Sequence, residues 1–199
     1  MKQVIYTASV ELRGITSLLI HKCGIIETNK KTDKETDYGD EWLTTIYTSK
    51  EDKTKLVIPA LNLEAMLRDA SPGTKIGKNF LSKIITPGAD IIGDGYEGFE
   101  SYLLFNNNFV FINDIKKNDW LFSCAVVIGK SRVTRTRVCL PAGWCVKFRI
   151  KVYDKIINKK TLEELLIKAG DKEGLMEWRP GSPKPGKFGQ FELENFKIC

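Results

Sequence analysis

Seven lysine and arginine residues lie between positions 130 and 151, and no aspartate or glutamate lies among them. They are Lys130, Arg132, Arg135, Arg137, Lys147, Arg149 and Lys151. A run of cations without counter-charges attracts polyanions, and nucleic acid is the usual polyanion of the cytosol. The planar guanidinium group suits phosphate, and we expect that the three arginines of SRVTRTR cannot all find partners inside the protein. This segment therefore predicts a phosphate-binding surface.

The segment 174–191, GLMEWRPGSPKPGKFGQF, combines four glycines and three prolines with the cations Arg179, Lys184 and Lys187. Glycine lets the backbone approach a ligand closely, proline stiffens the chain, and the cations attract anions. We expect Gly186 and Gly189 to let the backbone approach a phosphate chain, while Trp178 and Pro180 hold the loop on the core. The alternative is a long surface connection with ordinary turn chemistry.

Aromatic side chains near these cations offer flat surfaces on which bases stack. The candidates are Tyr47, Trp178 and Phe188, although packing in the core is at least as good an interpretation of each. The single histidine, His21, ends an apolar run and has no serine, cysteine or aspartate at motif spacing apart from nearby Cys23. We interpret it as a packed or surface histidine. Because no P-loop, HExxH, GxSxG or EF-hand motif occurs, we predict no catalytic residues.

The composition is that of a globular protein, with 42% hydrophobic and 28% charged residues in 199 positions and a net charge of +6. No run of about eighteen apolar residues occurs, and the first residues do not form a secretory signal, so we expect no membrane span and a cytoplasmic location. The five cysteines are scattered without a CxxC pair. We expect no metal site and no cofactor.

The cations must be positioned by regular elements, and the segment 144–153 has the clearest pattern of a strand. Trp144, Val146, Phe148, Ile150 and Val152 alternate with Lys147, Arg149 and Lys151. Alternate residues of a strand are about 6.5 to 7 Å apart, which is close to the phosphate spacing of an extended single strand. The alternative is a solvated strand face. Similar alternation predicts strands at 3–13 and 190–196, and one or two strands over 125–138.

Three helices are predicted. One covers 61–70, with Leu63, Met66, Leu67 and Ala70 on the buried side and Glu64 paired with Arg68 on the other. A second covers 75–85, with Phe80, Leu81, Ile84 and Ile85 buried. A third begins with the capping box at 161–164, buries Leu162, Leu165, Leu166 and Ala169, and is closed by Gly170.

The remaining segments are less regular. Strands at 102–105 and 109–112 are expected around a turn at 106–108, because asparagine tolerates positive φ. The segments 42–48 and 56–58 are expected to be short apolar or strand-forming segments at which the chain rejoins the core. The polar stretch 27–41 cannot bury enough surface to fix itself, so we expect a mobile insertion over 27–55 within a single domain, 1–199.

Three stretches in this order resemble the RAMP (repeat-associated mysterious protein) superfamily of CRISPR-associated proteins. They are VELRGITSLLIHKCG at 10–24, IPALNLEAMLR at 58–68 and GKFGQF at 186–191. They are similar to the family's N-terminal strand with its glycine, its phrase IPGSSLKGxLR and its loop GxxxxxRGFGR. The chain is most similar to the backbone subunit that polymerises along guide RNA in effector complexes.

The resemblance implies an α+β fold, a modified RRM-like or ferredoxin-like antiparallel sheet with helices on one face and a polar inserted loop or hairpin. It also implies non-catalytic binding of single-stranded RNA of guide type, by a repeating subunit of a ribonucleoprotein complex in antiviral defence. Among the family's positions, Arg68, Lys187 and the backbone of Gly186 and Gly189 match. Glu64 replaces the family's lysine and Gln190 its arginine, so the guide contacts are not carried over to these two positions.

Three alternatives stay open at this stage. A phage-encoded relative would bind single-stranded DNA or RNA, or would mimic a backbone subunit and inhibit CRISPR assembly. A metal-independent RNA-processing endonuclease would use His21, Tyr6 and Lys187. In some relatives a loop aspartate cuts target RNA, and Asp33, Asp37 and Asp40 lie in the corresponding stretch, but nothing in the sequence singles out one of them.

Overall fold

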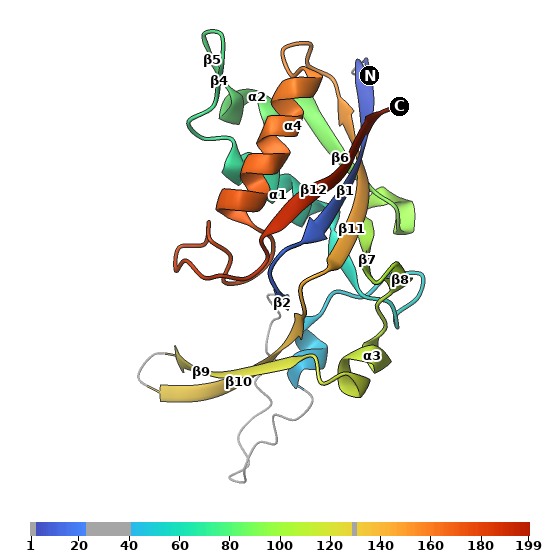
Figure 1. Ribbon diagram of the computed structural model, residues 1–199, viewed down its shortest axis with the longest axis vertical. Coiled ribbons are helices and arrows are strands. Elements are labelled where there is room, and N and C mark those ends of the chain that lie inside the picture. Colours follow the sequence, from blue (N-terminus) through green and yellow to red (C-terminus); the bar gives the residue numbers. More distant parts are fainter. Residues whose placement is uncertain (1–2, 23–40, 129–130) are drawn as a thin grey trace.

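The computed structural model describes residues 3–22, 41–128 and 131–199, and its centre is an antiparallel sheet of seven strands (Figure 1). The strand order is β12-β1-β11-β7-β3, while β6 also pairs with β11 and β8 with β7. The bounds are β1 (Tyr6–Gly14), β3 (Val57–Pro59), β6 (Ala89–Gly93), β7 (Glu100–Phe105), β8 (Asn108–Phe109), β11 (Trp144–Val152) and β12 (Phe191–Ile198). Helices α1, α2 and α4 lie together on one side of this sheet, which confirms the predicted α+β, ferredoxin-like class.

The strands β1 and β11 form the middle of the sheet, and both follow the predicted alternation. Val146, Ile150 and Val152 of β11 are fully buried, and so are Ala8 and Leu12 of β1. Their neighbours along each strand point to the opposite face. Because one face is buried throughout, a slip of one residue would expose every apolar side chain, and this fixes the register of the two strands.

Helix α1 (Ala60–Ala70) follows Pro59 and buries Leu63, Met66, Leu67 and Ala70, as the spacing predicts. Helix α4 (Lys159–Lys168) begins two residues before the predicted capping box. Its N-cap is Asn158, whose side-chain oxygen accepts the Thr161 N–H at 3.0 Å. Gly170 does not end the helical path, because a π-helical turn, η3 (Ala169–Glu173), continues it to Gly174.

The segment 75–85 differs from the single helix that was predicted. It forms a small hairpin, β4 (Lys75–Ile76) and β5 (Asn79–Phe80), which is followed by helix α2 (Leu81–Gly88). Gly77 has φ +59° and makes the tight turn possible. Leu81 and Ile85 are buried as predicted, but Phe80 is 44% exposed and lies under the Lys75 ammonium.

The turn between β7 and β8 has positive φ at Asn106 and Asn107, which confirms the predicted hairpin. The second strand is shorter than predicted, because α3 (Ile112–Lys117) begins at Ile112. The segment 42–48 contains a 3₁₀-helix, η1 (Glu41–Thr45), and another, η2 (Tyr96–Gly98), precedes β7. Of the predicted insertion, 27–40 lies outside the described residues, whereas the described part buries Trp42 completely.

A second, three-stranded sheet projects from the main one. The long strands β9 (Leu121–Ile128) and β10 (Ser131–Leu140) pair as a ribbon, and β2 (Leu18–Ile20) adds to the base of β10. Figure 1 shows the ribbon crossing below the main sheet, well away from α1 and α4. Within the described ranges, no helix has the length and apolar character needed to cross a membrane.

We predict that Gly14→Ala lowers the free energy of unfolding by about 1–3 kcal/mol, because a Cβ here must displace a buried ring. The new atom would lie 2.0 Å from Nε1 of Trp144, whose indole is fully buried and donates to the Thr16 carbonyl. Urea unfolding of both proteins measures the change. Ile15→Ala is the control, since this side chain is 49% exposed. An equal loss in both variants would contradict the packing argument.

Candidate nucleic-acid interface

Three aromatic side chains join the ribbon to the glycine-rich loop. Phe122 of β9 lies 6.1 Å from Trp178 and 5.7 Å from Phe188, and the two loop rings are 6.3 Å apart, all between ring centroids. All three side chains are half-buried. We call them the aromatic cluster. Each ring packs against the other two, and each also has surface left for a ligand.

A network of charged side chains lies beside the aromatic cluster. Arg137 of β10 is 8% exposed, lies 2.6 Å from the Glu177 carboxylate and sits over the Trp178 ring at 5.9 Å. His21 is 3.6 Å from the same carboxylate. Arg135 forms an ion pair with Glu41. We call the charged residues and the histidine the ribbon-base network, because they hold the base of the ribbon on the body of the protein. Its five members are Arg137, Glu177, His21, Arg135 and Glu41.

The arginines of β10 thus differ in how they are used. We expected that the three arginines of β10 could not all find internal partners. Arg135 and Arg137 have carboxylate partners, and the third arginine has none in the part of the chain that the structure describes. Glu41 and Glu177 are far from these arginines in sequence, so an acid-free stretch of chain does not predict an acid-free surrounding. Arg132 is exposed and makes no ion pair within the described residues, so it remains available to a phosphate.

The pKa of His21 is lowered from its usual 6.5, mainly by burial and further by Arg137 and Arg135. Glu177 and Glu41 act in the opposite direction and do not outweigh these effects. The neutral imidazole is therefore favoured in the folded protein.

The backbone of the glycine-rich loop is largely committed to internal contacts. The N–H of Gly186 donates to the Arg179 carbonyl at 3.2 Å, and that of Gly189 donates to the Ser17 carbonyl at 2.7 Å. A Cβ at Gly186 would lie 2.1 Å from the Trp178 oxygen, and one at Gly189 would lie 2.0 Å from the Leu175 oxygen. These glycines permit close packing within the protein, and their N–H groups have partners other than a phosphate.

The loop is also anchored to α1. Arg179 pairs with Asp69 at 3.1 Å, and the Asn62 amide donates to the Met176 sulfur at 3.3 Å. Met176 and Trp178 have φ of 66° and 49°, a backbone region that side chains disfavour. Lys184 and Lys187 lie further along the loop, exposed and without an ion pair in the part of the chain that the structure describes.

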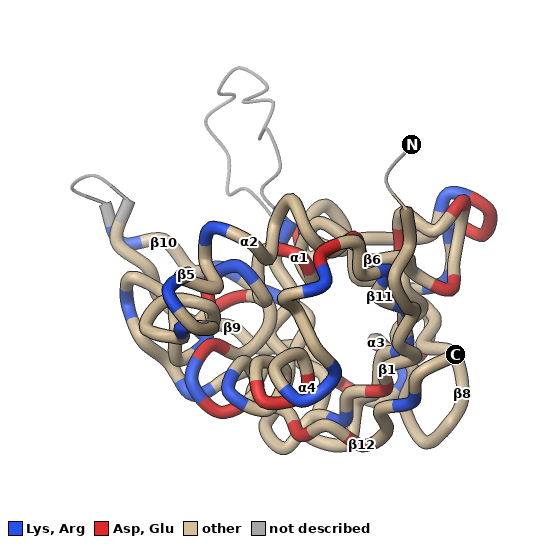
Figure 2. The backbone as a smooth tube through the Cα atoms, turned by 90° about the horizontal axis from the view of Figure 1, so that it is seen from above, with Lys and Arg blue, Asp and Glu red and all other residues tan. Residues whose placement is uncertain are grey.

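The cation row of β11 faces away from the helices, as predicted, but other strands supply carboxylates to it. Lys147 pairs with Glu11 of β1 at 3.1 Å, and Lys151 lies opposite Asp90 of β6. Arg13 pairs with Glu194 at the edge of the same sheet. Figure 2 shows acidic as well as basic positions around β1, β11 and β12. The sheet face is therefore close to charge-balanced, with Arg149 and Lys197 as exposed cations without an ion pair among the described residues.

Arg68 projects from α1 with 58% of its side chain exposed, and it pairs with the adjacent Asp69 at 3.0 Å. The predicted Glu64–Arg68 pair is not formed. Tyr47 is half-buried, with the Lys22 ammonium 5.9 Å from its ring. No group of His, Cys, Asp and Glu side chains that could hold a metal ion occurs among the described residues.

The residues of the proposed endonuclease are not brought together as a set. Tyr6 donates to the Ile157 carbonyl at 2.9 Å beside the start of α4, and burial raises its pKa to about 12. His21 lies in the ribbon-base network. The sequence did not single out Phe122, because the pattern over 115–123 was ambiguous. It did not single out Glu177 either, because only the glycines, prolines, aromatic residues and cations of the loop were considered as functional.

Comparisons with known proteins place the fold. No protein-family model and no curated protein matches the chain. Among solved structures, a chain in the cryo-EM structure of the Type III-B Cmr-beta bound to cognate target RNA is similar, with a TM-score of 0.62 and 14% identity. The likeness shows a shared fold. It covers 97% of this chain and 60% of that chain, so the protein spans about three fifths of its neighbour's length.

We predict that His21→Gln reduces the loss of stability on acidification. Unfolded His21 takes up a proton near its usual pKa of 6.5, whereas the folded protein resists protonation until lower pH. Acid below about pH 6.5 therefore favours unfolding, and the variant lacks this contribution. Melting temperatures at pH 7.5 and 5.5 check it. Equal drops in both proteins would contradict the prediction.

We further predict that Arg137→Ala costs about 3–5 kcal/mol of unfolding free energy, because it leaves the Glu177 carboxylate without its closest cation. Arg132→Ala on the same strand should change it by less than about 0.5 kcal/mol, because this side chain is exposed. Denaturant unfolding measures both. Similar costs would show that the network does not anchor the ribbon.

Proposed function

We propose that this protein binds single-stranded RNA without cleaving it, as a subunit of a CRISPR effector complex of the RAMP type. The RNA would run along the ribbon and the glycine-rich loop. The observation that carries the proposal is the pair of exposed lysines Lys184 and Lys187, which have no ion pair among the described residues and lie on the same loop as Trp178 and Phe188 of the aromatic cluster. Arg132 adds a cation further out on the ribbon, opposite Val127, and the fold is shared with a chain of an RNA-bound assembly.

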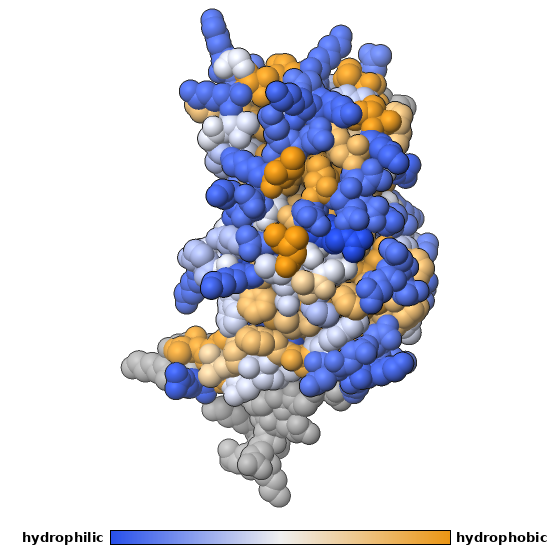
Figure 3. All heavy atoms as spheres, viewed as in Figure 1, coloured by the Kyte–Doolittle hydropathy of each residue, from blue (hydrophilic) through white to orange (hydrophobic). Residues whose placement is uncertain are grey.

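The chemistry of this surface suits a single strand. Arg132, Lys184 and Lys187 supply positive charge without internal partners in the described structure, so they retain their full attraction for phosphate. Phe122, Trp178 and Phe188 offer ring surface on which bases stack without regard to sequence. Figure 3 shows apolar side chains along the ribbon with hydrophilic ones beside them, the mixture that stacking and phosphate contacts require.

The proposal differs in emphasis from the expectation of a basic sheet face. Lys147 and Arg135 have carboxylate partners, and a phosphate would have to displace these carboxylates to reach them. The exposed loop lysines and Arg132 pay no such cost. We therefore assign the main role to the ribbon and loop and a lesser one to Arg149 and Lys151.

The subunit would bind beside further copies or other subunits along the RNA. If so, the mass of the complex, measured by light scattering, increases in steps as the RNA is lengthened. A constant ratio of one protein per RNA at every length would contradict the repeating arrangement while leaving RNA binding intact.

We predict that the double variant Arg132→Ala/Lys187→Ala weakens binding to single-stranded RNA for all sequences and reduces its salt dependence. Loss of two phosphate contacts should make the slope of log affinity against log salt shallower by about 1.4. Fluorescence anisotropy over a salt series measures this slope. Lys160→Ala on α4 is the matched control, because it removes a cation that is 85% exposed far from the ribbon.

Two results would contradict the proposed function. The first is absence of binding by the unmodified protein at low salt, or binding that does not weaken as salt rises. The second is cleavage of RNA in the absence of metal, because it would establish an endonuclease. If His21→Ala abolished that cleavage, the histidine would be the catalytic group.

A further inference from the structure

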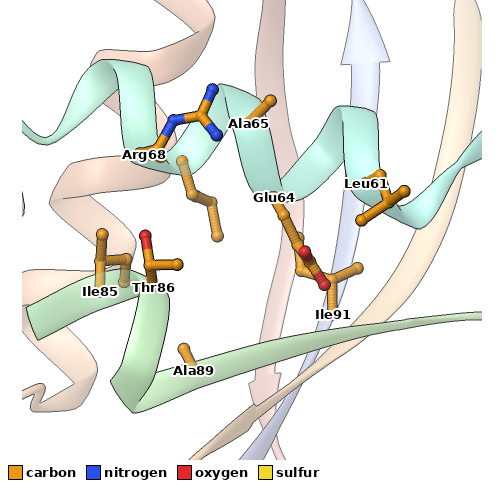
Figure 4. A pocket seen from close by; sticks show the side chains of 9 residues that line it. Leu61, Glu64, Ala65, Arg68, Ile85, Thr86, Ala89 and Ile91 are labelled. Atoms are coloured by element: carbon orange, nitrogen blue, oxygen red, sulfur yellow. The ribbon is translucent and has the colours of Figure 1, made fainter.

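A cavity of about 200 Å³ lies between α1, α2 and β6, away from the ribbon (Figure 4). Its lining comes from the outward side of α1 and from the chain that leads from α2 into β6. The lining residues are Leu61, Glu64, Ala65, Leu67, Arg68, Ile85, Thr86, Ala89 and Ile91. Pockets for larger organic ligands have about 300 Å³ or more, so this one suits a single nucleobase or one large side chain.

The walls of the cavity are mostly apolar. Leu67, Ile85, Ala89 and Ile91 are buried residues of the core, and Figure 4 shows the last three on the side opposite α1. Leu61 is 74% exposed at the rim. Such walls favour a flat, apolar face. Stacking of a ring against aliphatic side chains removes this surface from water.

One carboxylate interrupts these walls. Glu64 points from α1 toward Ile91, as Figure 4 shows, and the backbone N–H of Ile91 acts to lower the pKa of its carboxyl group. In the described structure β6 pairs with β11 alone, so Glu64 covers part of its open edge. Burial raises the pKa of Glu64, and the nearby charge of Asp90 adds to this. A carboxylate beside apolar walls gains stability from any further hydrogen-bond donor that enters the cavity.

The cavity and the glycine-rich loop share α1. Asn62 and Asp69, on one side of this helix, contact Met176 and Arg179 of the loop. The stripe Leu61, Ala65 and Arg68 lies about a quarter turn further around the helix and borders the cavity. A strand held on the loop therefore passes within reach of the cavity mouth.

We propose that this cavity binds a guanine base of single-stranded RNA, an inference that rests on the proposed function. The edge of guanine carries an imino N–H next to an amino group, and these two donors match the two oxygens of the Glu64 carboxylate. The faces of the base lie against the aliphatic walls. Arg68, with 58% of its side chain exposed at the rim, meets the phosphate.

Other occupants fit less well. A leucine or phenylalanine of a partner protein would bury the carboxylate without giving it a donor, which costs free energy. A lysine or arginine would pair with Glu64 but would bring a second charge against the aliphatic walls, and its desolvation costs free energy. Uracil presents carbonyl oxygens on both sides of its imino group, and adenine and cytosine offer only an amino group as donor.

The test compares an oligouridine with the same oligouridine carrying one central guanosine, by fluorescence anisotropy. We expect the guanosine to increase affinity about tenfold, as for a good bidentate contact to a base. In Glu64→Gln the two RNAs should bind within about twofold of each other, because one carboxylate oxygen becomes an amide donor. Glu163→Gln on α4 is the matched control and should keep the tenfold preference. Melting temperatures verify that each variant is folded.

A second measurement does not depend on the length of the RNA. Titration with GMP should shift the NMR methyl signals of Thr86 and Ala89, whereas UMP should not, and Ala65→Trp, which fills the mouth, should abolish the GMP shifts. Equal affinity for the two RNAs, a preference that survives Glu64→Gln, or no shift with GMP would overturn the guanine site. Failure of both RNAs to bind would overturn the proposed function instead. The GMP titration alone would then show whether the cavity binds guanine.

Discussion

The buried ion pair between Arg137 and Glu177 is the contact on which the candidate interface depends. It joins a strand of the ribbon to the glycine-rich loop, two segments that meet only in the folded protein. The guanidinium also lies over the Trp178 ring, and this positions the aromatic cluster. Two charges are expensive to desolvate, and loss of either partner would leave the other buried without its counter-charge, so the pair ties the ribbon to the loop.

From this pair, a chain of contacts leads through the loop to α1. Glu177 lies between two residues with positive φ, and the next cation, Arg179, pairs with Asp69 of the helix. The loop is thus anchored on both sides, while its outer lysines make no ion pair with any residue that the structure describes. Charges that hold the fold together and charges available to a ligand are separated on the same segment. Composition cannot show this separation, because a paired and an unpaired arginine count equally toward the net charge of +6.

The strands and helices with a regular hydrophobic period could be predicted from the sequence. The tertiary contacts of their side chains could not. The alternation around Val146 and Phe148 and the stripe of α1 led to the correct strand and helix, because burial on one side imposes a period. The hairpin at Gly77 was missed, since the apolar residues that follow it fit a helix equally well. Neither carboxylate in the ribbon-base network could be foreseen, because Glu41 and Glu177 reach β10 only through tertiary packing. The same holds for Phe122 in the aromatic cluster, which had no local signal.

The pairing of β1 with β12 has a consequence for how the protein folds. Ala8 lies opposite Ile198, so neighbours in the sheet are separated by nearly the whole chain. Closing so large a loop costs entropy before any contact offsets it, and such topologies fold slowly. On a ribosome, β1 must wait for β12 to emerge, with the edge of β1 unpaired until then. That edge is open to wrong pairing until β12 pairs with it and protects it.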